Sequence, residues 1–255
     1  MKEWKLEEIT YRLVRERTYE VAVLPVGATE PHGFHLPYGT DIFGSELLAD
    51  RVCEAAHGLG ARVIQLPTIP YGVDANLMRF PLTLHVPQST LDAIVMDIVG
   101  SLEHHGILKL VLFNGHGGND FKPFVRSLYG RTKVFVCIVD WWKVGSDQWT
   151  KILDTVGDHA GELETSVALE LFGELVHPAE AGDGATNPSR FEAINREWVS
   201  ITRPWHLFTS DSGAGDPSRA TREKGKACVD VVVDRIGAFI KELSVSRMDE
   251  AFPFQ

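Results

Sequence analysis

The chain has 255 residues, enough for one large α/β domain or two small ones, and its 44% of hydrophobic residues is the share of an ordinary globular protein. Lys and Arg number 25 against 35 Asp and Glu, which gives a formal net charge of −10. A surplus of negative charge repels phosphate groups. The composition therefore argues against nucleic acid and anionic membranes as partners and favours a small molecule.

The cysteines and the first residues indicate a cytoplasmic protein. Cys53, Cys137 and Cys228 lie far apart within apolar stretches, which favours buried thiols in a reducing compartment over disulfides. The first twenty residues carry charges throughout and resemble no secretory signal. No segment reaches the roughly 18 apolar residues of a membrane helix.

Strand-like apolar segments alternate with segments of helical period from about residue 20 to residue 176, which predicts a parallel sheet with crossover helices. The predicted strands are residues 21–26, 62–69, 109–113 and 133–139. The predicted helices are residues 45–56, a helix that begins near Ser89 and ends at Gly106, residues 121–129 and residues 162–176. Ser89 and Asp92 suit a variant of the capping box at the start of the second helix.

The remainder of the chain divides into an irregular segment and a helix. Residues 178–217 are enriched in Gly, Pro, Ser, Asp and Asn with scattered aromatic residues, a composition that favours an ordered lid or a subunit contact. Residues 219–243 carry apolar side chains at helical spacing and are predicted to form a helix that packs on the core. Since there is no internal repeat or linker, we expect one domain over residues 1–255.

The segment TEPHGFHLPYGTD, residues 29–41, directly follows the first predicted strand. In an open parallel sheet, ligands bind beyond the carboxyl ends of the strands. Glu30 and His32 are two residues apart, so extended backbone places both on one side, and Pro31 between them restricts the backbone. Two ligands of one metal ion fit there. Asp41 is either a third ligand of this site or the N-cap of the following helix.

The segment NGHGGND, Asn114 to Asp120, follows the third predicted strand. Glycines around His116 allow the backbone to approach a ligand closely. Their spacing matches only two of the three glycines of the dinucleotide-binding pattern. A nucleotide or sugar-phosphate binding module that uses this turn remains an alternative from a different functional class. We favour His116 as a metal ligand, because a second metal-capable cluster leaves the same sheet edge.

The segment GDHAGELETS, residues 157–166, precedes a predicted helix. His159 and Glu162 are three residues apart and can face the same way. Glu162 and Glu164 diverge by roughly half a turn if the helix has begun, so only one of them reaches the site. Acids at a helix N-terminus often only interact with the helix dipole. We favour Glu162 for the site, and Glu164 stays open as the alternative.

Together the three segments supply a candidate metal-ligand set of two nitrogens and three carboxylates. Its members are Glu30, His32, Asp41, His116 and Glu162. The set is too large for one tetrahedral zinc with an open position and suits two divalent ions that share a bridging carboxylate and a bridging water. Zinc, manganese and iron all tolerate these ligands. Two close cations lower the pKa of the water toward neutrality, which predicts a hydrolase.

Three motifs in this order, LPVGATEPHGFHLPYGTD, NGHGGN and HAGELETS, resemble those of the creatininase, or creatinine amidohydrolase, family. The resemblance covers about residues 20–245. It implies a three-layer α/β/α domain with a mostly parallel central sheet, a binuclear site for zinc or manganese, and a homo-oligomer, commonly a hexamer.

The resemblance also implies roles for individual residues. It places Glu30 and His116 on one ion, His32 on the other and Asp41 between them, and it gives His159 the role of proton shuttle. The chain departs from the family at Gly118, where creatininases carry a glutamate ligand. Family members with two glycines there tend to have a glutamate in the HAGE segment, so Glu162 is expected as the replacement and as a second catalytic residue beside His159.

A second departure concerns the substrate. Creatininases place a tryptophan shortly before the loop histidine, and the neighbourhood of Thr155 lacks one, so creatinine itself is not the expected substrate. Trp141 and Trp142, after the fourth strand, either line the pocket instead or pack at a loop or subunit contact. Gly117 and Gly118 are further candidates for substrate contact.

The expected reaction begins with a metal-bridging hydroxide that attacks a carbonyl, after which His159 passes a proton to the leaving group. The expected bond is an amide, formamide or cyclic amide C–N bond, and the opening of a cyclic ketone such as a keto-inositol ring is the alternative. His35 either contacts the substrate or braces the loop by hydrogen bonds. A third possibility, an inactive structural subunit, is disfavoured by the intact ligand set.

Overall fold

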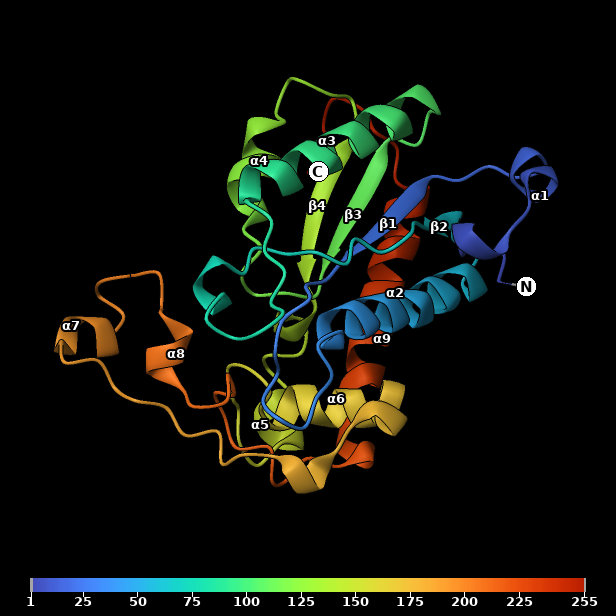
Figure 1. The fold of residues 1–255 in the computed structure, drawn as a ribbon. Helices are drawn as coiled ribbons and strands as arrows, with labels where there is room; N and C mark the ends of the chain where they lie inside the picture. The colour runs from blue at the N-terminus through green and yellow to red at the C-terminus, as the bar shows by residue number, and fades with distance from the viewer. Residues whose placement is uncertain (1, 255) are drawn as a thin grey trace.

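The computed structural model describes residues 2–254, and its centre is a four-stranded parallel sheet (Figure 1). The strands are β1 (Val21–Val26), β2 (Val63–Gln65), β3 (Lys109–Asn114) and β4 (Phe135–Asp140), in the order β2-β1-β3-β4. All three neighbouring pairs are parallel, which confirms the predicted sheet. The predicted strand 62–69 pairs continuously only over β2, because Pro67 has no N–H for the ladder. Ile69 meets β1 again through an isolated bridge to Val26.

Helices cover both faces of the sheet (Figure 1). On one face α2 (Thr40–Gly58) and α9 (Arg222–Val245) pack against side chains such as Val23 and Phe113, and α6 (Glu162–Phe172) packs on these two helices. On the other face α3 (Gln88–His104) and α4 (Phe121–Ser127) pack against side chains such as Leu24 and Leu112. Successive strand residues alternate between the faces. This confirms the expected three-layer α/β/α fold.

Two helix starts differ from those predicted. The first long helix, α2, begins at Thr40 rather than residue 45, with Gly39 as its N-cap, so Asp41 lies in the first turn and is not the cap. The capping box expected at Ser89 and Asp92 is wrong. The helix begins at Gln88 after Pro87, which has no side-chain donor or acceptor for capping.

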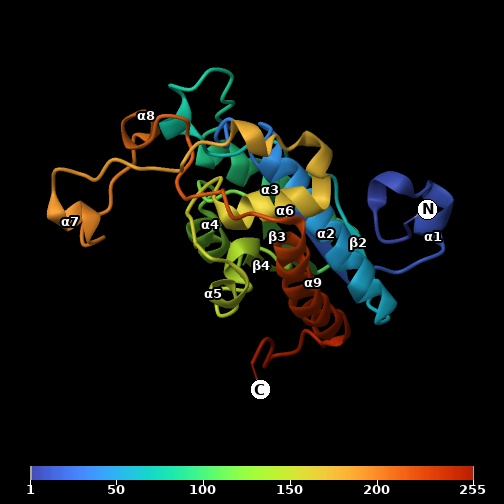
Figure 2. The same ribbon diagram turned by 90° about the horizontal axis from the view of Figure 1, so that it is seen from below.

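The remaining elements are short. They are α1 (Tyr11–Arg15), α5 (Trp149–Ile152), α7 (Glu192–Asn195), α8 (Trp205–Phe208), and the 3₁₀ helices Leu6–Glu8, Ala75–Leu77, Trp141–Lys143, Gly173–Leu175 and Pro178–Glu180. Residues 178–217 thus form an ordered excursion with little regular structure. Its α7 stands away from the body of the molecule in both views (Figures 1 and 2), whereas Trp205 in α8 is buried.

The three cysteines are free thiols, with Cys53 and Cys228 buried and Cys137 partly buried. Burial raises the pKa of all three thiols, so they stay protonated at neutral pH. No helix formed by residues 2–254 has the length and apolar character needed to span a membrane.

The connections that follow β1 and β3 lead to opposite faces of the sheet, which opens a crevice between them. The connection after β1 leads to α2 on one face, and the connection after the neighbouring β3 leads to α4 on the opposite face. The two loops therefore separate at the carboxyl ends of the strands, which is where open α/β sheets bind ligands.

Candidate metal centre

Acidic and imidazole side chains from five segments of the chain meet in this crevice. Glu30 and His32 come from the loop after β1, Asp41 from the first turn of α2, Asp74 from the loop after β2, His116 from the loop after β3, and the last segment supplies His159 just before α6 and Glu164 in its first turn. All but Glu164 are buried. Four of the five predicted ligands are therefore brought together, along with His159.

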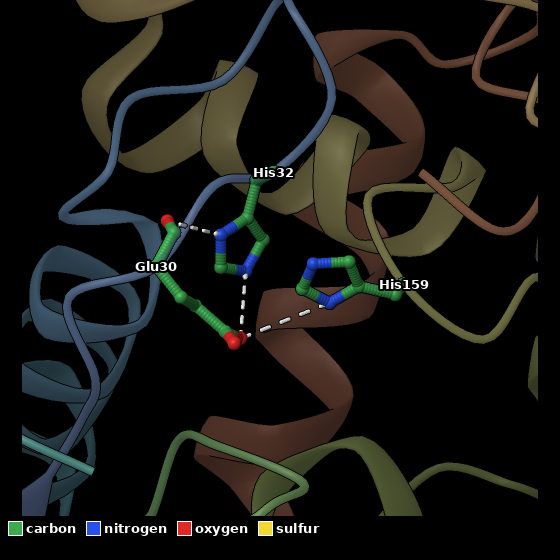
Figure 3. A group of neighbouring side chains, drawn as sticks. All are labelled: Glu30, His32 and His159. Atoms are coloured by element: carbon green, nitrogen blue, oxygen red, sulfur yellow. Dashed lines mark hydrogen bonds and ion pairs between the residues drawn. The ribbon is translucent and has the colours of Figure 1, made fainter. Parts of the chain in front are cut away.

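The loop after β1 presents Glu30 and His32 to the same space (Figure 3). His32 Nδ1 lies 3.2 Å from the Glu30 carbonyl oxygen, to which it donates, so Nε2 is left facing the carboxylates. Figure 3 shows His159 beside His32, with both rings directed toward the Glu30 carboxylate, and His159 Nδ1 is 4.0 Å from Glu30 Oε1. Thr29 anchors the loop through a 2.8 Å hydrogen bond to the Pro70 carbonyl.

Two of the groups that could hold a cation lie side by side. Glu30, Asp74 and His116 form one, and His32, Asp41 and Glu164 form another. In each group the candidate ligand atoms lie within 4.8 Å of one another. Asp41 connects the two, since its Oδ1 is 3.1 Å from His32 Nε2 and its Oδ2 is 3.1 Å from His116 Nδ1. The geometry resembles two adjacent sites that share one carboxylate.

Several of these buried carboxylate oxygens have no hydrogen-bond partner within residues 2–254. They are Glu30 Oε2, Asp41 Oδ2 and both oxygens of Asp74. Asp74 Oδ1 lies 3.0 Å from His116 Nε2, but the two are not aligned for a hydrogen bond. Leaving buried carboxylate oxygens without a hydrogen bond is costly. Divalent cations satisfy such oxygens, and the mixture of imidazole and carboxylate donors fits zinc, manganese or iron.

The pKa values describe how the cluster balances its charge without a cation. Burial raises the pKa of Glu30 to about 8 and that of Glu164 to about 7. Burial lowers the pKa of His32, but the charges of Asp41 and Glu30 outweigh it and raise that pKa to about 10. Burial likewise lowers the pKa of His116, and Glu30, Asp41 and Asp74 raise it well above its ordinary value. All four shifts favour the protonated form, as expected where several buried acids gather.

His159 is held as a neutral imidazole with one nitrogen facing the cluster. Its Nε2 donates to the Pro31 carbonyl at 3.0 Å, so Nδ1 carries the lone pair. Burial and the charge of His32 lower the pKa of His159 to about 3. The ring packs between His32 and Trp205, with centroid distances of 4.2 and 5.0 Å.

Glu162 does not reach this cluster, so its expected placement is wrong. Its buried carboxylate accepts hydrogen bonds from Asp154 N at 3.2 Å and Thr155 N at 2.7 Å, and it pairs with Lys224. The helix α6 begins at Glu162 itself, so the residue two places later points about 200° away from it. Glu164 is the one that faces the cluster, with Oε2 3.9 Å from His159 Nδ1.

A side chain at Gly118 is sterically excluded. A Cβ there would lie 2.3 Å from His116 Nε2 and 2.5 Å from the Val73 carbonyl, whereas a Cβ at Gly117 would meet nothing within 4 Å. The glutamate that creatininases carry at this position has no room in this loop conformation. Glu164 brings a carboxylate to the cluster from another element.

Gly118→Ala should therefore displace the His116 ring and weaken zinc binding by about tenfold or more, since small shifts of a ligand cost affinity on this scale. Gly117→Ala is the matched control and should bind zinc like the unmodified protein. Zinc titration of the demetallated variants measures the difference. Equal affinities for the two variants would contradict the steric argument.

A cavity of about 670 Å³ opens above the cluster. The residues that line it include Asn76, Gly117, Gly118, Trp142, Trp149, Asp158, Arg203 and Trp205. Trp141 instead packs in the core, 4% exposed. His35 lies among buried residues, with Nε2 2.9 Å from Thr165 Oγ1.

Asp74 was missed by the sequence analysis. The available signal was an acid soon after β2, at the same sheet edge as the other loops.

Comparison with known protein sequences points to one family. A family model described as creatininase, creatinine amidohydrolase, matches residues 7–240. The creatinine amidohydrolase of Pseudomonas putida is 30% identical, with 87% of this chain and 89% of that protein covered. The 3-dehydro-scyllo-inosose hydrolase of Thermotoga maritima is 25% identical, with 93% and 82% covered.

Solved structures agree with the sequence comparison. A crystal structure of a Bacteroides fragilis protein described as a creatinine amidohydrolase has a TM-score of 0.90 at 35% identity, with 98% of this chain and 100% of that chain covered. A Zn–Zn form of a creatininase mutant has a TM-score of 0.79 at 25% identity, with 96% and 100% covered.

Proposed function

This chain belongs to the creatininase family of hydrolases, and we propose that it hydrolyses a small molecule with the help of two divalent metal ions. The observation that carries the proposal is the pair of adjacent ligand groups joined by Asp41. The family model and the sequence relatives confirm the family resemblance inferred from the three motifs. The metal count, the substrate and the roles below are part of the proposal.

Glu30, Asp74 and His116 would hold one ion, His32 and Glu164 the other, and Asp41 would lie between them. The buried oxygens of Glu30, Asp41 and Asp74 that make no hydrogen bond support this assignment, as does the likeness to a Zn–Zn creatininase. We propose zinc or manganese as the metals, with iron also compatible. Ions bound there supply the acidity that ionises water near neutral pH and the positive charge that polarises a carbonyl.

The protein's own groups then move the proton. His159 Nδ1 is unprotonated and faces the Glu30 and Glu164 carboxylates at 4.0 and 3.9 Å. It can accept a proton as the nucleophile attacks and deliver it to the leaving nitrogen, because the Nε2 hydrogen bond to Pro31 fixes the ring orientation. Trp142 and Arg203, which line the cavity, would contact the part of the substrate remote from the scissile bond.

We propose an amide, formamide or cyclic amide C–N bond as the target. The likeness to the Pseudomonas putida creatinine amidohydrolase supports it. Opening of a cyclic ketone by C–C hydrolysis is the second candidate, supported by the likeness to the Thermotoga maritima hydrolase. We further propose a single domain, a cytoplasmic location and a homohexamer, the last two from the free thiols and the family resemblance.

A substrate panel tests the reaction class. Lactams, formamides and cyclic ketones should be screened with the demetallated protein reloaded with zinc or manganese. Metal-dependent turnover of at least one compound class is expected. Absence of turnover throughout, combined with a rise in melting temperature when phosphate-bearing ligands are added to demetallated protein, would instead support the binding module at the turn Asn114 to Asp120.

Metal binding should release protons and strengthen as the pH rises. Without metal, Glu30 with a pKa of about 8 and His32 with a pKa of about 10 both hold protons at pH 7. A cation must displace these protons, so apparent affinity should rise by about tenfold per pH unit for each proton released below the relevant pKa. Calorimetric zinc titrations in buffers of different ionisation enthalpy count the protons. Zinc binding without proton release at pH 7 would contradict this account.

A further inference from the structure

Ser212, in the segment between α8 and α9, is fully buried behind the loop that carries Glu30 and His32. Its Oγ donates to the Pro31 carbonyl at 3.0 Å and accepts from Gly33 N at 3.0 Å. One hydroxyl thus bonds the residue before His32 and the residue after it. No other side chain within residues 2–254 hydrogen-bonds both sides of His32 in this way.

The backbone at Ser212 is in an unfavourable conformation for serine. Its φ is +74°, in the left-handed region that L side chains other than Asn and Asp seldom adopt. Glycine would adopt this φ without steric cost. Residues held in sparsely populated conformations cluster at functional sites, so the outlier motivates a search for what the serine side chain does here. The hydroxyl, which glycine lacks, is what serine adds.

The same segment also fixes His159. The Pro31 carbonyl that accepts from Ser212 accepts from His159 Nε2 as well, at 3.0 Å. Two residues beyond Ser212, Ala214 exchanges backbone hydrogen bonds with His159, at 3.0 Å from His159 N to Ala214 O and 2.8 Å in return. Residues 212–214 therefore tie the loop that bears two candidate ligands to the loop that bears the candidate proton shuttle.

We propose that Ser212 is a positioning residue for the metal centre. Its hydroxyl fixes the backbone on both sides of His32, so that Glu30 and His32 keep the spacing at which they can hold cations. It also holds the Pro31 carbonyl in place as the acceptor that orients His159. Ser212 itself touches neither a cation nor a substrate. The inference rests on the proposed metal-dependent function.

The test measures zinc affinity and does not depend on the substrate. Demetallated Ser212→Gly, Ser212→Ala and unmodified protein are titrated with zinc in competition with a chromophoric chelator. Both substitutions remove the hydroxyl, but glycine suits the left-handed backbone and alanine does not, so Ser212→Gly stays folded if alanine is not tolerated. The exposed Ser210, replaced by alanine, is the control.

Both Ser212 variants should bind zinc about 10- to 100-fold more weakly at one site or both, the range typical when a group that supports a metal ligand is removed. The control should match the unmodified protein. A Ser212→Gly variant that binds zinc as tightly as the unmodified protein would overturn the inference, because only the backbone conformation would then matter. If the unmodified protein binds no zinc, the proposed function fails and the inference fails with it. If both Ser212 variants and the unmodified protein bind two zinc ions equally tightly, the proposed function stands and only the role of Ser212 is contradicted.

Discussion

Replacing His116 by alanine should release at least one of the two proposed ions and abolish hydrolysis. The ring is central to the cluster, with Nδ1 3.0 Å from Glu30 and 3.1 Å from Asp41, and Nε2 3.0 Å from Asp74. Its loss removes the nitrogen donor of one ligand group. A metal ion contributes several kcal/mol to stabilising the transition state, so the rate should fall by about a thousandfold or more.

Metal content per chain and kcat/KM on the best substrate of the panel are the two measurements. His206→Ala is the control, because this exposed imidazole lines a smaller neighbouring pocket and does not line the main cavity. It should keep both ions and full activity. A His116→Ala protein with unchanged metal content and activity would show that the cluster is not a metal centre.

Glu164→Gln and Glu162→Gln should have opposite consequences, although the two residues are only two positions apart. Glutamine at 164 weakens the ligand group of His32 and Asp41, so one ion should be lost and activity should fall by about a thousandfold. Glutamine at 162 removes the charge that pairs with Lys224 and leaves the cluster untouched. Since charged hydrogen bonds contribute about 1.5–3 kcal/mol, the free energy of unfolding should drop by that amount.

Metal analysis and denaturant unfolding of the same two proteins separate these effects. Each variant serves as the control for the other, because the chemical change is identical. Loss of metal in Glu162→Gln with retention in Glu164→Gln would restore the original expectation from the sequence and contradict the assignment of Glu164.

The fold was predictable from the sequence because its two central strands are buried on both faces. The continuous apolar segments that became β1 and β3 have no polar face, which is typical of a parallel sheet between two helical layers. Helix starts were less predictable. Helix α2 starts at Thr40, directly after the turn at Gly39, and α3 starts directly after Pro87 without a capping side chain. Such boundaries depend on local turns and tertiary contacts more than on periodicity.

The candidate site was predictable where the ligands lie in motifs next to strand ends. Glu30, His32 and His116 each follow a strand closely, so the common sheet edge brings them together. The choice between Glu162 and Glu164 depends on the rotational phase of α6. One residue of uncertainty in the helix start turns each side chain by about 100°, so the sequence could not decide. Asp74 belongs to no motif and is brought in by the path of its loop.

The central claim is that one buried cluster holds two divalent cations, and zinc titration of the demetallated protein tests it most directly. The account predicts two tight sites per chain, and Asp41→Asn should weaken both, since this residue lies between the two ligand groups. A stoichiometry of one or zero, or an Asp41→Asn protein that still binds two ions with unchanged affinity, would contradict it.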